Sequence, residues 1–355
     1  MKVELFPFQK RALADIRMKT AEAMGSYHRT HAPQVVSFTA PTGAGKTIIM
    51  ASLIESIFFG DENYAEQPNA IIVWLSDSPQ LNEQSKLKID SKADKIRLSQ
   101  CVTVSEDSFD KETFENGHIY FLNTQKLSTS SKLTKNGDGR TYTIWQTLAN
   151  TVRHKSDRLY FIIDEAHRIG AKSYQEIMNY FKPKFWLGMS ASPERTDDFD
   201  VYAAFDHNIA YEIRLQQALE ENLLCPFHYF GITDFLTNDN ETDFTDFNYL
   251  TSNQRVDYII EQTNYYGYSG ERVKGLMFCS SKKEAAALSE RLNLRGYRTL
   301  ALSGEDSQEK REDAIDRLVS DTRSDYLQYI LTVDIFNEGV DIPEINQVVL
   351  LRPTQ

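Results

Sequence analysis

The chain has 355 residues, of which 41% are hydrophobic and 25% are charged. This composition is typical of a folded protein of about two domains and excludes a disordered chain. The formal net charge is −12, which repels phosphate backbones at long range, so composition alone argues against a general nucleic-acid binder.

Neither membrane insertion nor secretion is indicated by the sequence. No apolar run approaches the roughly 18 residues of a membrane span, and the amino-terminal residues do not resemble a secretory signal. The three cysteines are far apart and show neither a disulfide framework nor the spacing of zinc ligands. We therefore expect a cytoplasmic protein with buried free thiols and no membrane partner.

The first half of the chain alternates short apolar runs with helical patterns. Near-continuous apolar runs of this length predict parallel strands that are covered by helices on both faces. The predicted strands are residues 35–38, 70–75, 118–122, 159–163 and 185–189. The predicted helices between them include residues 47–58 and 173–180.

The second half repeats this rhythm, which predicts a second α/β domain. Its predicted strands are residues 227–232, 275–279, 299–302, 329–332 and 347–351, and its clearest helix is 282–295. A helix over 215–221 is expected to end at Asn222, because asparagine tolerates the left-handed conformation and Pro226 cannot continue a helix. We therefore predict an α/β fold with mainly parallel sheets in two tandem domains, residues 1–222 and 223–355.

A phosphate-binding loop is indicated by the stretch Ala-Pro-Thr-Gly-Ala-Gly-Lys-Thr between a predicted strand and a predicted helix. Gly43 and Gly45 let the backbone turn its N–H groups towards a phosphate, and the helix N-terminus adds a partial positive charge. Lys46 is expected to reach the β- and γ-phosphates, and Thr47 to ligate Mg²⁺. The usual pattern begins with glycine, whereas this stretch begins with Ala40.

Two acidic residues, Asp164 and Glu165, follow the apolar strand predicted at 159–163. Carboxylates resist burial unless they are paired or bound to a cation. A cation explains both: Asp164 holds Mg²⁺ through water, and Glu165 orients and deprotonates the attacking water. Together with the phosphate loop, this pair predicts an ATP hydrolase that uses Mg²⁺ as a cofactor.

Residues 164–167 read Asp-Glu-Ala-His, and with the phosphate loop they resemble the superfamily 2 DEAD/DEAH-box helicases and translocases. Residues 190–193, Ser-Ala-Ser-Pro, resemble the family motif that links hydrolysis to movement. The continuation 194–197, Glu-Arg-Thr-Asp, is similar to the motor subunits of restriction enzymes, the type III restriction, Res subunit-like group. The resemblance covers almost the whole chain with its motifs in the family's order. It implies two tandem RecA-like P-loop domains, an amino-terminal ATP-binding domain and a carboxy-terminal helicase domain.

The same resemblance implies a role for each residue that matches a family motif. The residues implied in cofactor binding are Phe8, Gln9, Thr42, Gly43, Ala44, Gly45, Lys46, Thr47, Gly339 and Asp341, and those implied in catalysis are Lys46, Asp164, Glu165 and His167. The implied metal ligands are Thr47 and Asp164. The implied nucleic-acid contacts are Thr124, Lys126, Ser280 and Thr332, and the residues that couple hydrolysis to movement are Ser190 and Ser192.

One departure from the family pattern concerns the arginine fingers. In the family they follow a strand that resembles residues 348–355, and this sequence stops there. We therefore expect a second domain that is incomplete at its C-terminus, as part of a longer protein. Since an arginine finger typically raises turnover by about 10³–10⁵, we expect this chain to bind ATP but hydrolyse it weakly.

The resemblance implies an ATP-dependent helicase or translocase core whose turnover is stimulated by nucleic acid. Contacts through neutral N–H groups and hydroxyls, which position a strand without reading its sequence, would reconcile such binding with the net charge. DNA is favoured over RNA, with a restriction, phage-defence or repair system as the setting and a nuclease or modification subunit as a candidate partner. Two alternatives stay open: an RNA helicase, and a nucleotide-switched binding protein or scaffold that does not translocate.

Overall fold

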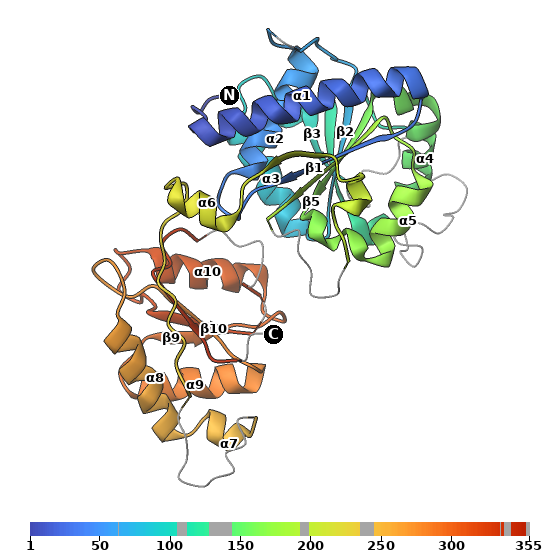
Figure 1. The fold of residues 1–355 in the computed structure, drawn as a ribbon. Coiled ribbons are helices and arrows are strands. Elements are labelled where there is room, and N and C mark those ends of the chain that lie inside the picture. The colour runs from blue at the N-terminus through green and yellow to red at the C-terminus, as the bar shows by residue number, and fades with distance from the viewer. Residues whose placement is uncertain are drawn as a thin grey trace. The chain divides into compact units, whose positions relative to one another are not determined.

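The computed structural model (Figure 1) describes residues 1–62, 64–104, 112–127, 144–191, 199–234, 245–333, 335–336 and 342–352. It divides into two compact units, Met1–Phe227 and His228–Gln355, close to the predicted boundary after residue 222. Each unit is an α/β layer structure in which all strands pair in parallel, which confirms the predicted fold class.

The first unit contains a seven-stranded sheet with the order β3-β4-β2-β5-β6-β1-β7. Its strands are β1 (Gln34–Thr39), β2 (Ile71–Ser76), β3 (Cys101–Thr103), β4 (His118–Asn123), β5 (Leu159–Asp164), β6 (Phe185–Ser190) and β7 (Ile209–Glu212). Because β6 lies between β5 and β1, the carboxyl ends of these three strands meet at one edge of the sheet.

Helices cover both faces of this sheet (Figure 1). They are α1 (Pro7–Thr30), α2 (Lys46–Phe59), α3 (Pro79–Lys92), α4 (Ile144–Lys155), α5 (Lys172–Tyr180) and α6 (Leu215–Glu220). Alternate residues of a strand face opposite sides, so Trp74 of β2 packs in the same core as α1, α2 and α3, whereas Val73 packs in the core formed with α4 and α5. The buried strands therefore read as continuous apolar runs.

The second unit contains a four-stranded sheet with the order β11-β8-β10-β9. Its strands are β8 (Gly275–Phe278), β9 (Thr299–Ala301), β10 (Tyr329–Thr332) and β11 (Gln347–Leu350). Its helices are α7 (Phe247–Leu250), α8 (Asn253–Tyr266), α9 (Lys282–Leu294) and α10 (Gln308–Val319). Helices α8 and α9 contribute to one core cluster, and α10 contributes to the other.

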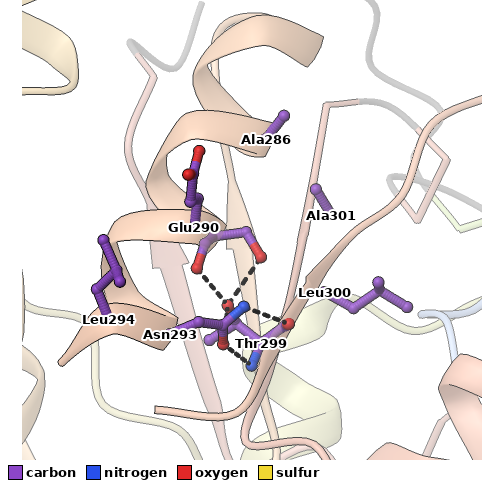
Figure 2. A pocket seen from close by; sticks show the side chains of 8 residues that line it. Ala286, Glu290, Asn293, Leu294, Thr299, Leu300 and Ala301 are labelled. Carbon is purple, nitrogen blue, oxygen red and sulfur yellow. Dashed lines mark hydrogen bonds between the residues drawn. The ribbon is translucent and has the colours of Figure 1, made fainter. Parts of the chain in front are cut away.

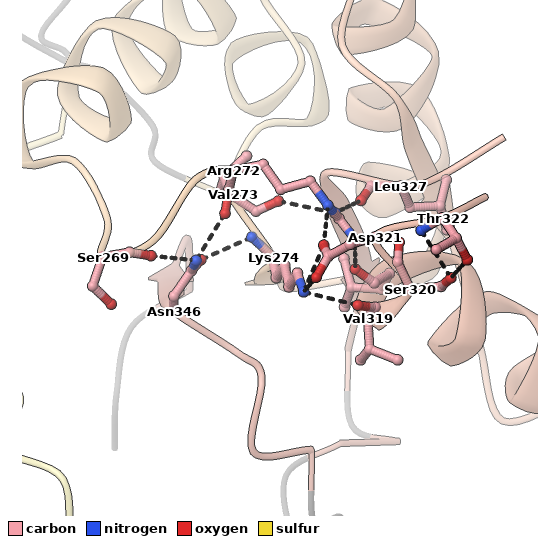
Figure 3. A network of polar contacts seen from close by, with 11 residues as sticks. Ser269, Arg272, Val273, Lys274, Val319, Ser320, Asp321, Thr322, Leu327 and Asn346 are labelled. Carbon is pink, nitrogen blue, oxygen red and sulfur yellow. Dashed lines mark hydrogen bonds and ion pairs between the residues drawn. The ribbon is translucent and has the colours of Figure 1, made fainter. Parts of the chain in front are cut away.

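A polar network in the second unit closes the end of α10 (Figure 3). The guanidinium group of Arg272 donates hydrogen bonds of 2.7 Å to the backbone carbonyls of both Leu318 and Ser320. Arg272 and Lys274 also pair with the Asp321 carboxylate at 3.0 and 2.8 Å. These contacts satisfy carbonyl groups that a helix leaves without partners at its C-terminus.

One predicted strand is wrong. Residues 227–232 pair with no strand, and Phe227 and Tyr229 are 62% and 73% exposed. Aromatic residues favour strands because they pack on a half-buried sheet surface, and within the described part of the chain this segment joins no sheet. The predicted helix end is confirmed: α6 ends at Glu220, and Asn222 has a φ of 55°, in the left-handed region. In the described part of the chain, no helix combines the length and apolarity needed to cross a membrane.

Candidate nucleotide-binding site

The predicted phosphate loop connects β1 to α2 at the carboxyl edge of the first sheet. Gly43 and Gly45 have φ values of 82° and 81°, which side chains with a Cβ atom rarely adopt. A Cβ atom at Gly45 would also lie 2.5 Å from Nε2 of Gln9. The backbone turn therefore favours glycine at both positions, and a side chain at residue 45 would also have to displace the Gln9 amide.

Lys46 is the first residue of α2, and its side chain is buried. Its Nζ atom donates a hydrogen bond of 3.1 Å to the carbonyl of Ala40. Burial lowers the pKa of Lys46, while the negative charges of Glu165 and Asp164 act in the opposite direction. No carboxylate among the described residues lies within ion-pair distance of Lys46, so this buried ammonium group fits an anionic ligand such as a phosphate.

Asp164 ends β5 and is buried. Its Oδ1 atom accepts a hydrogen bond of 3.1 Å from the Glu165 N–H, and its Oδ2 atom accepts one of 3.4 Å from the Ser85 hydroxyl on α3. Burial and the neighbouring Glu165 raise the pKa of Asp164 to about 6. Burial and the neighbouring charge disfavour the carboxylate form of Asp164, and a bound cation would favour it.

Glu165 has a φ of 53°, in the left-handed region that residues other than glycine rarely adopt. Its Oε2 atom lies 3.3 Å from Nδ1 of His167. Burial raises the pKa of Glu165, but the hydrogen bond from His167 and the charge of Lys46 outweigh it, so the pKa lies below its ordinary value. The structure therefore holds Glu165 as a carboxylate, the form that can accept a proton from water.

His167 also contacts the neighbouring strand. Its Nδ1 atom lies 3.5 Å from the hydroxyl of Ser190, the last residue of β6. The structure thus brings together Lys46, Asp164, Glu165, His167 and Ser190, which come from three separate strand ends. Local motifs predicted each residue, and the β5-β6-β1 order of the sheet explains their convergence.

Gln9 lies beside the phosphate loop. Its Nε2 atom donates a hydrogen bond of 3.0 Å to the carbonyl of Ala44, and its Oε1 atom accepts one of 3.0 Å from the N–H of Phe6. Phe8 is buried in the core of the first unit. The cofactor-binding roles that the resemblance implies for Phe8 and Gln9 therefore stay predictions.

The rest of the predicted loop residues follow its curve. In the loop, Thr42 and Gly43 are exposed and Ala44 is buried. Thr47 is half-buried in the first turn of α2. Among the described residues no cluster of three or more His, Cys, Asp or Glu side chains forms a protein cage for a metal. A cation such as Mg²⁺ would instead be held by Thr47, Asp164 and phosphate oxygens, the mode that is usual for Mg²⁺.

The residues predicted to contact nucleic acid differ in exposure and in hydrogen bonding. Ser280 is exposed, but its N–H and its hydroxyl both donate to Oε2 of Glu284, at 2.7 and 2.6 Å. Thr124 and Thr332 are buried, and the Thr332 hydroxyl has no hydrogen-bond partner among the described residues.

Other predicted residues lie beyond what the structure describes. The side chain of Lys126 and the whole of Ser192, Gly339 and Asp341 lie outside the described residues. Their implied roles in strand contact, coupling and nucleotide binding remain predictions.

Sequence reasoning missed two neighbours of the site. Ser85 contacts Asp164, and Arg168 forms an ion pair with Asp77, the residue that follows β2. Neither has a local signal, because each contact depends on the adjacency of β2 and β5 in the folded sheet.

A separate pocket lies between α9 and the edge strand β9 in the second unit (Figure 2). The side-chain amide of Asn293 bonds both backbone groups of Thr299: Oδ1 accepts from the N–H at 2.8 Å, and Nδ2 donates to the carbonyl at 3.1 Å. The Ser289 hydroxyl lies 2.8 Å from that of Thr299. None of the predicted site residues lines this pocket, so it is distinct from the candidate nucleotide site.

Two parallel α/β units, a phosphate loop and an acidic pair at a neighbouring strand end define the class of this protein: a superfamily 2 helicase core with RecA-like domains. The family model "Type III restriction enzyme, res subunit" matches residues 2–195, which is more than half of the chain. The chain therefore belongs to this family. The model "Helicase conserved C-terminal domain" matches residues 254–355.

Relatives and solved structures agree with this class. The chain is 23% identical over 207 residues to IRC3 of Saccharomyces cerevisiae, named as an ATP-dependent helicase, with 55% of this chain and 29% of that protein covered. It is 30% identical over 116 residues to the ATP-dependent RNA helicase DBP3 of Vanderwaltozyma polyspora, with 29% of this chain and 21% of that protein covered. The chain thus spans less than a third of the length of either relative.

The Hef helicase domain of Pyrococcus furiosus shows the fold in a solved structure. It is similar at a TM-score of 0.54 and 13% identity, with 95% of this chain and 91% of that chain covered. This likeness concerns the fold alone.

Proposed function

We propose that this chain is the ATP-driven core of a helicase or translocase that acts on DNA within a restriction, phage-defence or repair system. ATP binding is assigned to the first predicted domain, residues 1–222, and the second, residues 223–355, is assigned as the helicase domain. The family name and the Glu-Arg-Thr-Asp stretch after residue 193 support the restriction setting. A nuclease or modification subunit is the partner that this setting favours.

One observation carries the proposal of ATP hydrolysis: the buried Lys46 at the start of α2 and the Asp164–Glu165 pair at the end of β5 lie at the same edge of the first sheet. A buried cation at the start of a helix, beside a glycine-containing loop, neutralises phosphate charge. Glu165 is ionised at neutral pH and is suited to accept the proton of an attacking water. Mg²⁺, held through Thr47 and Asp164, would neutralise further charge on the phosphates.

His167 supports a route from hydrolysis to movement. Its Nδ1 atom lies 3.3 Å from Oε2 of Glu165 and 3.5 Å from the Ser190 hydroxyl, so one ring nitrogen links the candidate general base to the end of β6. A change in the charge or hydrogen bonding of Glu165 during turnover would alter the contact with Ser190. We therefore assign Ser190 to coupling, together with Ser192 further along the same segment.

The test is ATP turnover measured with no nucleic acid, with single- and double-stranded DNA, and with RNA. Lys46→Ala is expected to abolish turnover, whereas Lys172→Ala, which changes an exposed lysine of α5, is the matched control and is expected to have no effect. Unchanged turnover in Lys46→Ala would overturn the ATP site. If neither DNA nor RNA raises turnover, the motor assignment fails and a nucleotide-switched scaffold replaces it.

An RNA helicase is the second candidate, favoured by the similarity to the RNA helicase DBP3. Stimulation by RNA alone would select it over the DNA motor. Weak turnover by this chain also stays a prediction, and it is tested in the same assay.

A further inference from the structure

Trp74 and Ser85 surround the Asp164 carboxyl group from two different elements. Trp74 lies on β2, where it is paired in register with Ile162 of β5. Residues 162 and 164 of β5 share one face of the sheet, because side chains alternate along a strand. The large indole of Trp74 therefore lies on the same face as Asp164, on the adjacent strand.

The indole N–H of Trp74 is an unusual group. It is fully buried and has no hydrogen-bond partner among the described residues. Buried N–H donors are nearly always paired, so one that is not needs an explanation. Because Trp74 and Asp164 share one face of adjacent strands, the Asp164 carboxyl group is the candidate acceptor for this N–H.

Ser85 approaches the same carboxyl group from α3. Its hydroxyl is buried and donates to Oδ2 of Asp164 at 3.4 Å, while the Glu165 N–H donates to Oδ1 at 3.1 Å. The Ser85 hydroxyl and the Glu165 N–H therefore both donate to the carboxylate of Asp164, the last residue of β5. Such donors restrict the rotation of a metal-ligating carboxylate, and their loss commonly weakens metal binding by about 10- to 100-fold.

We propose that Trp74 and Ser85 are positioning residues that hold the Asp164 carboxylate in the orientation used for a divalent cation. The inference rests on the proposed ATP site but goes beyond it, since neither residue belongs to the predicted motifs. In this proposal the indole N–H of Trp74 donates to the Asp164 carboxylate when that carboxylate binds the cation.

The test measures Mn²⁺ binding in the presence of ADP, by electron paramagnetic resonance and by tryptophan emission. Mn²⁺ binds oxygen ligands as Mg²⁺ does, and it quenches nearby indoles. The chain has three tryptophans, so each can be replaced in turn. We expect Mn²⁺ to quench the wild-type emission, Trp74→Phe to lose most of this response, and Trp186→Phe, which changes another buried tryptophan, to keep it.

The affinity for Mn²⁺ separates positioning from packing. Ser85→Ala is expected to weaken Mn²⁺ binding by about 10-fold, and Ser85→Thr, which keeps the hydroxyl, is expected to restore most of it. Ser52→Ala is the matched control, because this buried hydroxyl bonds the Ile48 carbonyl within α2. If Ser85→Ala binds Mn²⁺ as tightly as the wild type, or loses no more affinity than Ser52→Ala, positioning by Ser85 is refuted.

Lys46→Ala distinguishes this proposal from the proposed function. Should nucleotide binding be independent of Lys46, the ATP site itself is wrong. Should nucleotide binding require Lys46 while Trp74→Phe and Ser85→Ala bind Mn²⁺ normally, only the positioning role is wrong. If Trp74→Phe does not fold, the wild-type quench and the Ser85 variants still decide the outcome.

Discussion

Arg255 of α8 and Glu284 of α9 form an ion pair of 3.1 Å in which both side chains are fully buried, at 1% and 0% exposure. Arg255 also donates to the carbonyl of Leu250 at 2.9 Å, and Glu284 accepts from Ser280. The pair therefore connects three segments of the second unit. The pair stabilises the fold only while both charges are present, because a single buried charge without a partner is strongly destabilising.

Arg255→Met is expected to destabilise the second unit by about 3–5 kcal/mol, since it leaves the Glu284 carboxylate buried without its partner. The double variant Arg255→Met with Glu284→Leu is expected to recover much of this loss. Urea unfolding followed by circular dichroism measures both. Arg291→Met, which changes a more exposed arginine of α9, is the control. An equal loss of unfolding free energy in Arg255→Met and Arg291→Met would refute the interpretation.

Glu165→Gln is expected to lower ATP turnover by at least about 100-fold, because the amide cannot accept a proton from water. ATP binding and unfolding free energy are expected to stay near their wild-type values, since glutamine has the same shape. Steady-state turnover, calorimetric ATP binding and urea unfolding make the three measurements. Glu176→Gln, on the surface of α5, is the control, and retention of turnover in Glu165→Gln would exclude this residue as the base.

Asp321 predicts a pH dependence in the second unit. Hydrogen bonds from Lys274 and Arg272 hold the pKa of its carboxyl below the ordinary value. The folded state therefore favours the ionised form, and its contribution is present above the unfolded pKa of about 3.9 and is lost as the pH falls through the lower folded value.

Asp321→Asn is accordingly expected to lower the unfolding temperature slightly at about pH 7, and the difference from wild type is expected to shrink at about pH 3. The effect is small because the carboxylate is exposed to solvent. Glu66→Gln, which changes another exposed carboxylate, provides the control. A difference that is constant with pH would show that the ion pairs are not its source.

Gly188 of β6 lies directly over the ring of Phe205. A Cβ atom at this glycine would lie 2.1 Å from Cζ of Phe205, so Gly188→Ala is expected to cost about 1–3 kcal/mol by overpacking. Combining it with Phe205→Leu is expected to cost less than the sum of the two single changes, as measured by urea unfolding. Gly231→Ala, where the added atom meets nothing within 4 Å, is expected to be neutral.

The sequence predicted those parts of the fold and site that have local signals. The phosphate loop and the Asp164–Glu165 pair are short motifs, and the apolar runs of β1, β2, β4, β5 and β6 follow from burial on both faces. Asn222 carried its own turn signal. By contrast, the run at 227–232 has strand composition without a partner strand, which composition cannot reveal.

The missed features depend on tertiary contacts. The long helix α1 was not predicted, although it packs on α2 and β1 and carries Gln9 to the phosphate loop. Trp74 and Ser85 reach Asp164 only because β2 pairs with β5 and α3 follows β2. The cysteine prediction was partly wrong as well, since Cys101 and Cys279 are buried but Cys225 is exposed.

The amide of Asn293 occupies the outer backbone groups of Thr299 as a neighbouring strand would. An open strand margin is a template for recruiting another polypeptide, and proteins that leave one uncovered tend to self-associate. The Asn293 side chain blocks pairing of another strand with β9 at Thr299, so an added strand would first have to displace it. The outer N–H and carbonyl of Thr299 are therefore already paired within the second unit, by one side chain of α9.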